Sequence, residues 1–227
     1  MKIKTLHRWD LTPKEAAETQ QKLRSSLRFL PWSKEIHIAV GVDLSFSVGS
    51  NVVYASAVAW DAEYGEVAES ALEKGEARFP YIPGLLAFRE LPVITEALKK
   101  LKTAPDIILV DGHGICHPRG MGIASHLGLM VDVPTIGCAK KKLVGTFAPP
   151  ADERFSSAPL YFKDEIAAVV LRSRANVKPI FVSPGNLIDL PSSEKAVKKL
   201  LGKYRIPEPL RWAHIKCNEY RKAFSIN

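Results

Sequence analysis

The chain has 227 residues, of which 46% are hydrophobic and 25% charged, so it can bury a core and is not an intrinsically disordered protein. No apolar run approaches the roughly 18 residues that a membrane-spanning helix needs, and the first residues lack the apolar core of a signal peptide, so we expect a soluble cytoplasmic protein. The net charge of +8 gathers at the two ends, with +5 over residues 1–34, +6 over 191–227 and −3 between them, which suits either a polyanionic partner or merely a well-solvated surface.

The first predicted elements are a helix and three strands. Residues 12–15 combine a threonine cap with a proline at the first helical position, so a helix is expected from there to about Leu27. Apolar and small residues alternate strictly over 37–46, which predicts a strand with two distinct faces. Strands at 52–60 and 67–77 follow after short turn-like breaks and complete an antiparallel meander.

The rest of the chain alternates between helices and strands. A helix over 85–101, interrupted or kinked at Pro92, precedes a short apolar run over 106–111 that is typical of a buried parallel strand. Further helices are expected near 123–130, 193–201 and 208–224, and further strands at 135–139, 166–171 and 180–182. This order predicts one α/β domain over residues 1–227, with a mixed sheet and helices on both faces, and it is compatible with a ribonuclease H-like architecture.

Three acidic residues are candidates for a metal site. Asp43 lies on the small-residue face of the first strand, and Asp111 ends the buried parallel strand, where open α/β sheets place ligands. Glu90 has apolar neighbours at the helical spacings i±3 and i±4, and a carboxylate on such a stripe is costly unless it is paired or bound to a cation. Carboxylates suit Mg²⁺ or Mn²⁺, and with a polyanionic partner they point to phosphodiester hydrolysis. On sequence alone, Asp43 can equally face solvent and Asp111 can cap a helix.

Two basic residues are further candidates, and each has an ordinary structural alternative. His214 lies at the edge of an apolar stripe on the last predicted helix, where a core histidine is also expected. Lys140 follows the strand over 135–139 and emerges at its carboxyl end, although a surface lysine fits the same pattern. The three cysteines are widely spaced and form no C-x-x-C pair, which excludes a disulfide framework and a cysteine zinc site.

Two loops are unusual in composition. Residues 111–122 hold four glycines after a strand, but the third glycine of a dinucleotide fingerprint falls on His117, which argues against a nicotinamide-dependent oxidoreductase. In residues 79–84 two prolines hold Tyr81 and Ile82 in a stiff backbone. This segment is either a rigid connector with Tyr81 packed on the core, or a wedge that parts base pairs.

Taken in order along the chain, these segments resemble the endonuclease V family, the deoxyinosine 3′-endonucleases. The resemblance runs over nearly the whole chain and rests on residues 41–46, 79–90, 111–114, 117–119, 122–128, 134–137, 139–140, 182–185, 205–209 and 213–214. It implies a ribonuclease H-like fold whose central mixed sheet is of the five-stranded type, the antiparallel meander being followed by parallel strands and flanked by helices.

The resemblance also implies roles for particular residues. Asp43, Glu90 and Asp111 become metal-binding acids, His214 a nearby metal or water contact, and Lys140 a phosphate or transition-state contact. A wedge beside a flipped-out hypoxanthine and its surrounding pocket would contact the nucleic acid through Pro80, Tyr81, Ile82, Pro83, Gly84, Leu86, Arg89, Gly112, His117, Ile123 and Gly137.

The implied activity is Mg²⁺-dependent DNA repair, with Mn²⁺ also supporting it. Such an enzyme cuts the second phosphodiester bond 3′ to deoxyinosine and leaves a 3′-hydroxyl and a 5′-phosphate. Two alternatives remain open: an endoribonuclease that acts on inosine-containing RNA with the same catalytic core, and a non-catalytic nucleic-acid-binding module. The expected partner is inosine-containing DNA or RNA, with no membrane association and no obligatory protein partner.

Overall fold

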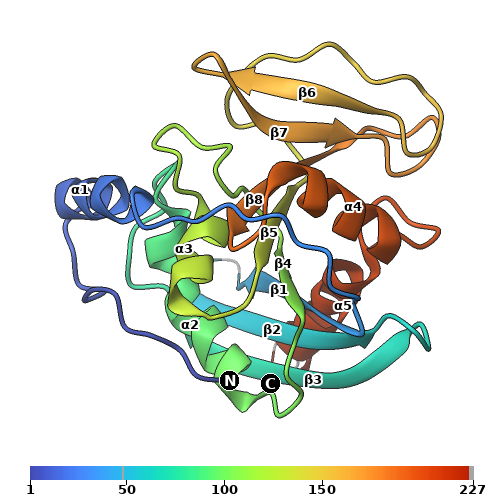
Figure 1. Cartoon of the computed structure of the whole chain (residues 1–227). Coiled ribbons are helices and arrows are strands. Elements are labelled where there is room, and N and C mark those ends of the chain that lie inside the picture. The colour runs from blue at the N-terminus through green and yellow to red at the C-terminus, as the bar shows by residue number, and fades with distance from the viewer. Residues whose placement is uncertain (48, 225–227) are drawn as a thin grey trace.

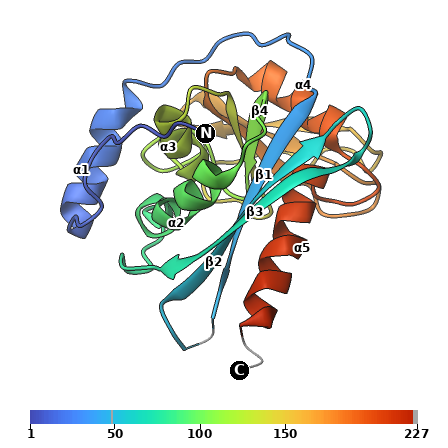
Figure 2. The same cartoon turned by 90° about the horizontal axis from the view of Figure 1, so that it is seen from below.

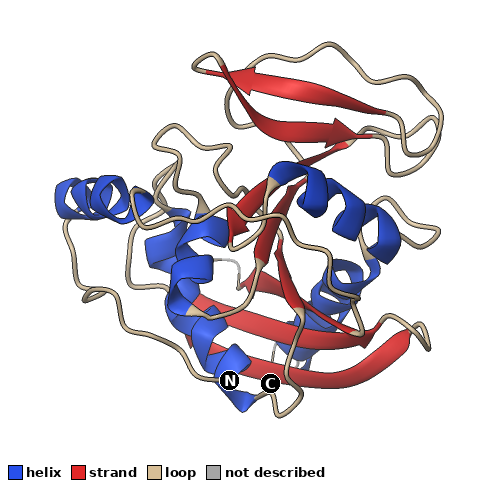
Figure 3. Cartoon of the chain, in the orientation of Figure 1, coloured by secondary structure: helices blue, strands red, loops and turns tan. Residues whose placement is uncertain are grey.

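The computed structural model describes residues 1–47 and 49–224. The described residues form helices α1 (Pro13–Arg24), α2 (Leu86–Lys100), α3 (Ile123–Met130), α4 (Leu190–Leu200) and α5 (Glu208–Ala223). The strands are β1 (Ile38–Phe46), β2 (Val52–Asp61), β3 (Glu66–Glu76), β4 (Ile107–Val110), β5 (Thr135–Ala139), β6 (Ser157–Phe162), β7 (Glu165–Leu171) and β8 (Ile180–Asn186) (Figures 1 and 3). None of these helices has the length and apolar content to cross a membrane.

All strands belong to one mixed sheet with the order β3-β2-β1-β4-β5-β8-β7-β6. The first three strands pair antiparallel, and β1, β4 and β5 pair parallel, which confirms the expected α/β class and the meander followed by parallel strands. Strands β8, β7 and β6 continue the sheet in antiparallel fashion, so it has eight strands in the described chain rather than a five-stranded core alone. The missed strand, β6, is an edge strand that contains Pro159 and buries only Leu160 fully, so its sequence lacks a strand pattern.

Helices cover both faces of the sheet. Figure 2 shows α2 and α5 on opposite sides of β1. Val40 and Val42 pack in the core that includes the apolar side of α2, whereas Ala39 belongs to the core on the other face, with Leu210 of α5. Both faces of β1 are therefore buried, although its alternating sequence resembles that of a strand with one wet face.

The small residues of β1 make room for α5. A Cβ at Gly41 would lie 2.2 Å from the backbone oxygen of Pro209, so only glycine allows the start of α5 to approach this closely. Ser56 of the neighbouring strand β2 donates a hydrogen bond of 2.7 Å to the backbone oxygen of Ala213. This close packing places the next turn of α5 against Asp43, two residues further along β1.

Helix α2 continues without a break through Pro92. A proline inside a helix removes one backbone hydrogen bond and strains the preceding turn. Leu91, Ile94 and Leu98 are buried on the sheet, and this packing holds the helix together across the proline. The expected interruption is therefore absent, and Glu90 lies within an ordered helix.

Candidate active site

Asp43 and Asp111 lie at equivalent positions on two neighbouring parallel strands. Val42 of β1 pairs with Val110 of β4, and each aspartate is the next residue along its strand. Neighbouring strands are roughly 4.8 Å apart, so the two carboxylates share one edge of the sheet. Asp43 is 9% exposed, which excludes the alternative that it simply faces solvent.

Asp43 is paired with His214 of α5. Nδ1 of His214 lies 2.7 Å from Oδ2 of Asp43, and this hydrogen bond raises the pKa of the imidazole above its usual range. The side chain of His214 is 57% exposed. His214 is therefore not a core histidine, and it presents its ring at the surface while a buried carboxylate holds one of its nitrogens.

A hydrogen-bond chain behind His214 sets the orientation and tautomer of its ring. Nδ2 of Asn218 donates to the backbone oxygen of His214 at 2.9 Å and contacts Nε2 of the ring at 3.1 Å. Because a carbonyl oxygen can only accept, the amide must turn its NH₂ group to this side, so Nε2 of the neutral ring accepts and Nδ1 carries the proton toward Asp43. Ser45 completes the chain by donating to Oδ1 of Asn218 at 3.0 Å.

Sequence analysis missed the positioning roles of Asn218 and Ser45. The helical spacing i, i+4 from His214 to Asn218 was the available indication. This spacing indicates a positioning role for Asn218 only once α5 is known to lie over β1.

Asp111 is paired with Lys140, which follows β5. Nζ of Lys140 donates to Oδ2 of Asp111, and the lysine and aspartate side chains are 38% and 22% exposed. Burial raises the pKa of Asp111, and the lysine charge acts in the opposite direction. The lysine is thus a fixed positive charge at the carboxyl end of the sheet rather than a free surface residue.

Glu90 reaches the same region from α2. Burial, and then the negative charges of Asp43 and Asp111, raise the pKa of Glu90 to about 7. The three carboxylates are therefore electrostatically coupled. Lys140 and His214 do not balance their combined charge fully, which leaves an environment that favours an additional cation.

The donor set fits a hard divalent ion, although the described residues contain no ready-made group of three His, Cys, Asp or Glu ligands. The contacts of Asp43 with His214 and of Asp111 with Lys140 both use Oδ2. Within the described part of the chain, Oδ1 of each aspartate has no hydrogen-bond partner. Two free carboxylate oxygens beside Glu90 are ligands of the kind that Mg²⁺ and Mn²⁺ prefer.

A cavity of about 430 Å³ opens beside the acids. Its lining includes ten of the residues predicted from the sequence, namely Tyr81, Pro83, Gly84, Leu86, Glu90, Asp111, Gly112, His117, Ile123 and Lys140. A Cβ at Gly112 would lie 2.5 Å from Cγ2 of Ile123, so the absence of a side chain at Gly112 lets Ile123 pack directly on the backbone in this part of the cavity wall. The cavity thus joins the acidic cluster to the stiff loop over residues 80–84.

The remaining predicted residues lie around the cavity rather than along its wall. Ile82 packs against the core cluster of Phe79, and Nη1 of Arg89 donates to the backbone oxygen of Phe79 at 2.6 Å. A Cβ at Gly137 would lie 2.4 Å from the backbone nitrogen of Gly114, so Gly137 allows the glycine-rich loop to pack on β5. These residues support the stiff loop and the cavity wall from behind.

The stiff loop is anchored at its end and exposed at its tip. Tyr81 is 69% exposed, which excludes the alternative that it packs on the core. The backbone oxygen of Gly84 accepts hydrogen bonds from Nη2 of Arg119 at 2.6 Å and from Nε2 of His117 at 3.0 Å. Burial, together with the charge of Arg119, lowers the pKa of His117 to about 4, so the ring is neutral at physiological pH.

Arg119 has a second anchor that the sequence did not reveal. Its Nε donates to Oε1 of Gln20 in α1 at 2.6 Å, and Nε2 of Gln20 donates to the backbone oxygen of Met121 at 2.9 Å. Sequence analysis left Gln20 unassigned and used Arg119 only as part of a matching segment. Their contact joins residues 99 positions apart, which local patterns do not report.

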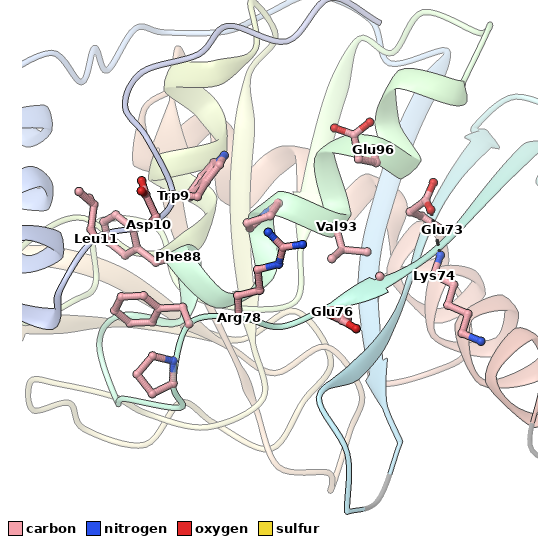
Figure 4. A pocket seen from close by; sticks show the side chains of 14 residues that line it. Trp9, Asp10, Leu11, Glu73, Lys74, Glu76, Arg78, Phe88, Val93 and Glu96 are labelled. Atoms are coloured by element: carbon pink, nitrogen blue, oxygen red, sulfur yellow. Dashed lines mark hydrogen bonds between the residues drawn. The ribbon is translucent and has the colours of Figure 1, made fainter.

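A second cavity, of about 910 Å³, lies beside the base of the stiff loop (Figure 4). It shares Pro80 with the loop, and its rim carries four acidic residues, Asp10, Glu73, Glu76 and Glu96. It contains none of Asp43, Glu90 and Asp111. Lys74 and Arg78 also line it, so its formal charge is −2, and because it lacks the three coupled acids we place the candidate active site in the smaller cavity.

Comparisons with known proteins show which family the chain belongs to. The family model for Endonuclease V matches residues 20–215. Endonuclease V of Thermosipho melanesiensis is 46% identical over 225 residues, which cover 99% of this chain and 98% of that protein. Endonuclease V of Myxococcus xanthus is also 46% identical, over 95% of this chain and 92% of that protein.

Solved structures show the same architecture. The crystal structure of Endonuclease V from Bacillus subtilis has a TM-score of 0.95 at 35% identity and covers all of both chains. Endonuclease V of Ciona intestinalis, in complex with a 24-mer DNA that contains an inosine followed by a ribo-adenosine, has a TM-score of 0.81 at 26% identity. That match covers 93% of this chain and 98% of the other.

Proposed function

We propose, on the premise that this chain belongs to the endonuclease V family and is therefore a nuclease, that it is a divalent-metal-dependent DNA repair enzyme for deaminated bases, chiefly deoxyinosine. It would hydrolyse the second phosphodiester bond 3′ to the lesion and leave a 3′-hydroxyl and a 5′-phosphate, with residues 1–227 acting as one catalytic domain. The observation that carries this proposal is the convergence of coupled carboxylates and an exposed aromatic residue on one cavity.

Asp43, Asp111 and Glu90 would hold the metal ion, for which Mg²⁺ is the physiological choice and Mn²⁺ a substitute. When bound, such an ion lowers the pKa of water and stabilises the oxygen that leaves phosphorus. His214, held by Asp43 through Nδ1, would position the attacking water through Nε2 of its exposed ring, with the water taking the place of the 3.1 Å contact from Asn218. Lys140 would offset the negative charge that the phosphate develops, which it can do because it already lies at the edge of the acidic cluster.

The cavity of about 430 Å³ would receive the lesion base after it leaves the stack. Flipping a base costs a few kcal/mol, and the cost is smallest for a mispaired base, which already favours a deaminated site. Main-chain N–H groups along the glycine-lined wall at Gly84 and Gly112 would read the oxygen at position six, which inosine has and adenine lacks. Tyr81 would fill the gap that the base leaves behind.

Two other functions compete with this one. An endoribonuclease that acts on inosine in RNA would use the same residues, and the Ciona relative was crystallised with an inosine followed by a ribonucleotide. A non-catalytic binding module is less consistent with the site. Crowding three carboxylates until the pKa of Glu90 reaches about 7 costs stability, and a surface that only binds phosphate has no use for them.

The direct test is cleavage of labelled oligonucleotides. Matched DNA and RNA strands with either inosine or adenosine at one position are incubated with the protein, with Mg²⁺ or with EDTA. We expect Mg²⁺-dependent cuts at the second bond 3′ to inosine and stronger cleavage of DNA than of RNA. Stronger cleavage of RNA would favour the endoribonuclease, and binding without any cleavage would favour the module.

A further inference from the structure

A narrow groove adjoins the cavity of about 430 Å³ that would receive the lesion base, which we call the lesion cavity. The groove has no part in the proposed reaction. It encloses about 220 Å³ and shares His117 with the lesion cavity. Its walls come from the end of α1, the loop at 115–120 and the turn between β6 and β7, three segments that are distant in sequence. The groove is smaller than the roughly 300–1,000 Å³ of pockets that enclose a whole small molecule. It therefore suits part of a longer chain.

Two cations, Arg24 and Lys163, and one acid, Glu165, line this groove, which leaves an excess of one positive charge. In the described residues neither Arg24 nor Lys163 forms an ion pair. A Cβ at Gly120 would lie 2.5 Å from Nε of Arg24, so the glycine, at a φ of +64°, makes room for the arginine along the loop. Nζ of Lys163 has only neutral partners, the backbone oxygen of Pro118 at 3.4 Å and the ring of Phe162 at 5.3 Å.

The backbone holds Lys163 in this place. Lys163 and Asp164 both have positive φ angles, 52° and 63°, which are those of the tight turns that join two antiparallel strands. Such angles are unfavourable for residues other than glycine, aspartate and asparagine. The strained turn projects the lysine from the hairpin toward the loop at Pro118.

Aromatic rings line the groove beside the cations. Phe29 is 43% exposed, an unusual position for a phenylalanine, and Phe162 is half-buried on the opposite hairpin. Aromatic faces next to unpaired basic side chains are the combination with which proteins hold single-stranded nucleic acid, since bases stack on the rings and cations contact the backbone.

We infer that this groove binds the nucleotides on the 5′ side of the lesion, an inference that rests on the proposed function. The strand on the 3′ side must pass the acids, because hydrolysis is proposed there. The groove contains none of those acids and meets the lesion cavity at His117, whose ring donates to the backbone oxygen of Gly84 in the stiff loop. Arg24 and Lys163 contact phosphates of the 5′ segment, and Phe29 stacks against one of its bases.

The test is the affinity of the full chain for fluorescein-labelled single strands, measured by anisotropy in EDTA so that no cleavage occurs. One strand carries ten nucleotides 5′ and one 3′ of the inosine, and the other carries one 5′ and ten 3′. The double variant Arg24→Ala/Lys163→Ala is compared with Lys34→Ala/Lys195→Ala. The latter removes two exposed cations that line a different cavity, next to Trp32, and so matches the change in charge.

For the strand with the long 5′ flank, we expect Arg24→Ala/Lys163→Ala to weaken binding about tenfold. The slope of log affinity against log salt should fall by about 1.4, which corresponds to two lost phosphate contacts on a single strand. Phe29→Ala should weaken binding of the same strand. For the strand with one 5′ nucleotide the loss should disappear, and the control variant should change either affinity by twofold at most.

An equal loss with both strands, or an equal loss in the control variant, would overturn the inference and leave only a general charge effect. A loss that follows the length of the 3′ flank would overturn it as well. Cleavage of inosine strands by the wild-type chain decides the proposed function separately, so the two ideas can fail independently.

Discussion

The two ends of the lesion cavity are built in opposite ways. At the acidic end, two side chains on rigid strands are held by partners, Asp43 by His214 and Asp111 by Lys140. At the loop end, Tyr81 is exposed and contacts little, while the backbone behind it is fixed by prolines and by the hydrogen bonds to Gly84. Under the proposed function, the chemistry would use fixed side chains, whereas opening the duplex would use a fixed backbone with a free side chain.

The largest effect should come from the acidic end. Asp111→Asn keeps the shape of the side chain but removes the charge that pairs with Lys140 and that would hold a cation, so cleavage should fall by at least about a thousandfold. Binding of inosine DNA should persist, because the loop end is untouched. Single-turnover cleavage and anisotropy measure the two separately. Near wild-type cleavage, or cleavage that survives EDTA, would contradict the metal assignment.

The next effect should come from the tip of the loop. Removing the ring of Tyr81 forfeits stacking of roughly 1–3 kcal/mol, which corresponds to a tenfold to hundredfold loss of preference for inosine over adenine in duplex DNA. Tyr81→Phe serves as the control and should retain most of the preference. If Tyr81→Ala lost thermal stability instead, with equal losses on all substrates, the side chain would be structural.

A smaller effect should follow from loosening a partner at the acidic end. Asn218→Ala removes one hydrogen bond to His214, and a typical value of about 1 kcal/mol predicts a fivefold to tenfold lower kcat with an unchanged KM. Lys216→Ala, on the same helix but paired with Glu219, is the matched control. Nitrogen-15 shifts of His214 should change at Nε2 in Asn218→Ala alone, while Nδ1 stays protonated because it still donates to Asp43. A fall in kcat together with a rise in KM and a lower Tm would mean general damage to α5.

The last effect concerns folding stability in acid rather than cleavage, and it comes from the loop end. Burial lowers the pKa of His117 to about 4, whereas in the unfolded chain it is near 6.5. The unfolded chain therefore binds the proton first, and the contribution of His117 to folding stability should fall as pH drops from 6.5 to 4, by roughly 2 kcal/mol between pH 7 and pH 5. Thermal unfolding across that range measures it, and His117→Asn should flatten the slope. His37→Asn, at an exposed position, should leave the slope unchanged.

The acidic end was more predictable from sequence than the loop end. Glu90 was identifiable because a carboxylate interrupts an apolar helical stripe, and Asp111 because it ends a buried strand. The sequence pattern could not decide whether Asp43 is buried, because the alternation in β1 does not indicate that α5 covers the second face of the strand. Glycine at position 41 is the residue that made this cover possible.

The features that could not be predicted from the sequence depend on contacts between segments that are distant along the chain. Asn218 needs the packing of α5 on β1, the anchor of Arg119 needs α1, and the groove needs Arg24 beside a hairpin turn 139 positions further along. Strand β6 was not predicted because Pro159 and its exposed neighbours obscure the alternation of apolar and polar residues within the strand itself. Periodicity therefore located most elements, and only tertiary packing joined them into a site.

The separation of chemistry from duplex opening is tested most directly by opening the duplex in advance. Single-turnover cleavage is measured for the wild-type chain, Tyr81→Ala and Asp111→Asn, on inosine in a fully paired duplex and in a duplex with a small unpaired bubble around the lesion. The bubble should restore Tyr81→Ala to near wild-type rates and leave Asp111→Asn inactive. Rescue of neither variant, or equal rescue of both, would contradict the division of labour between the two ends of the cavity.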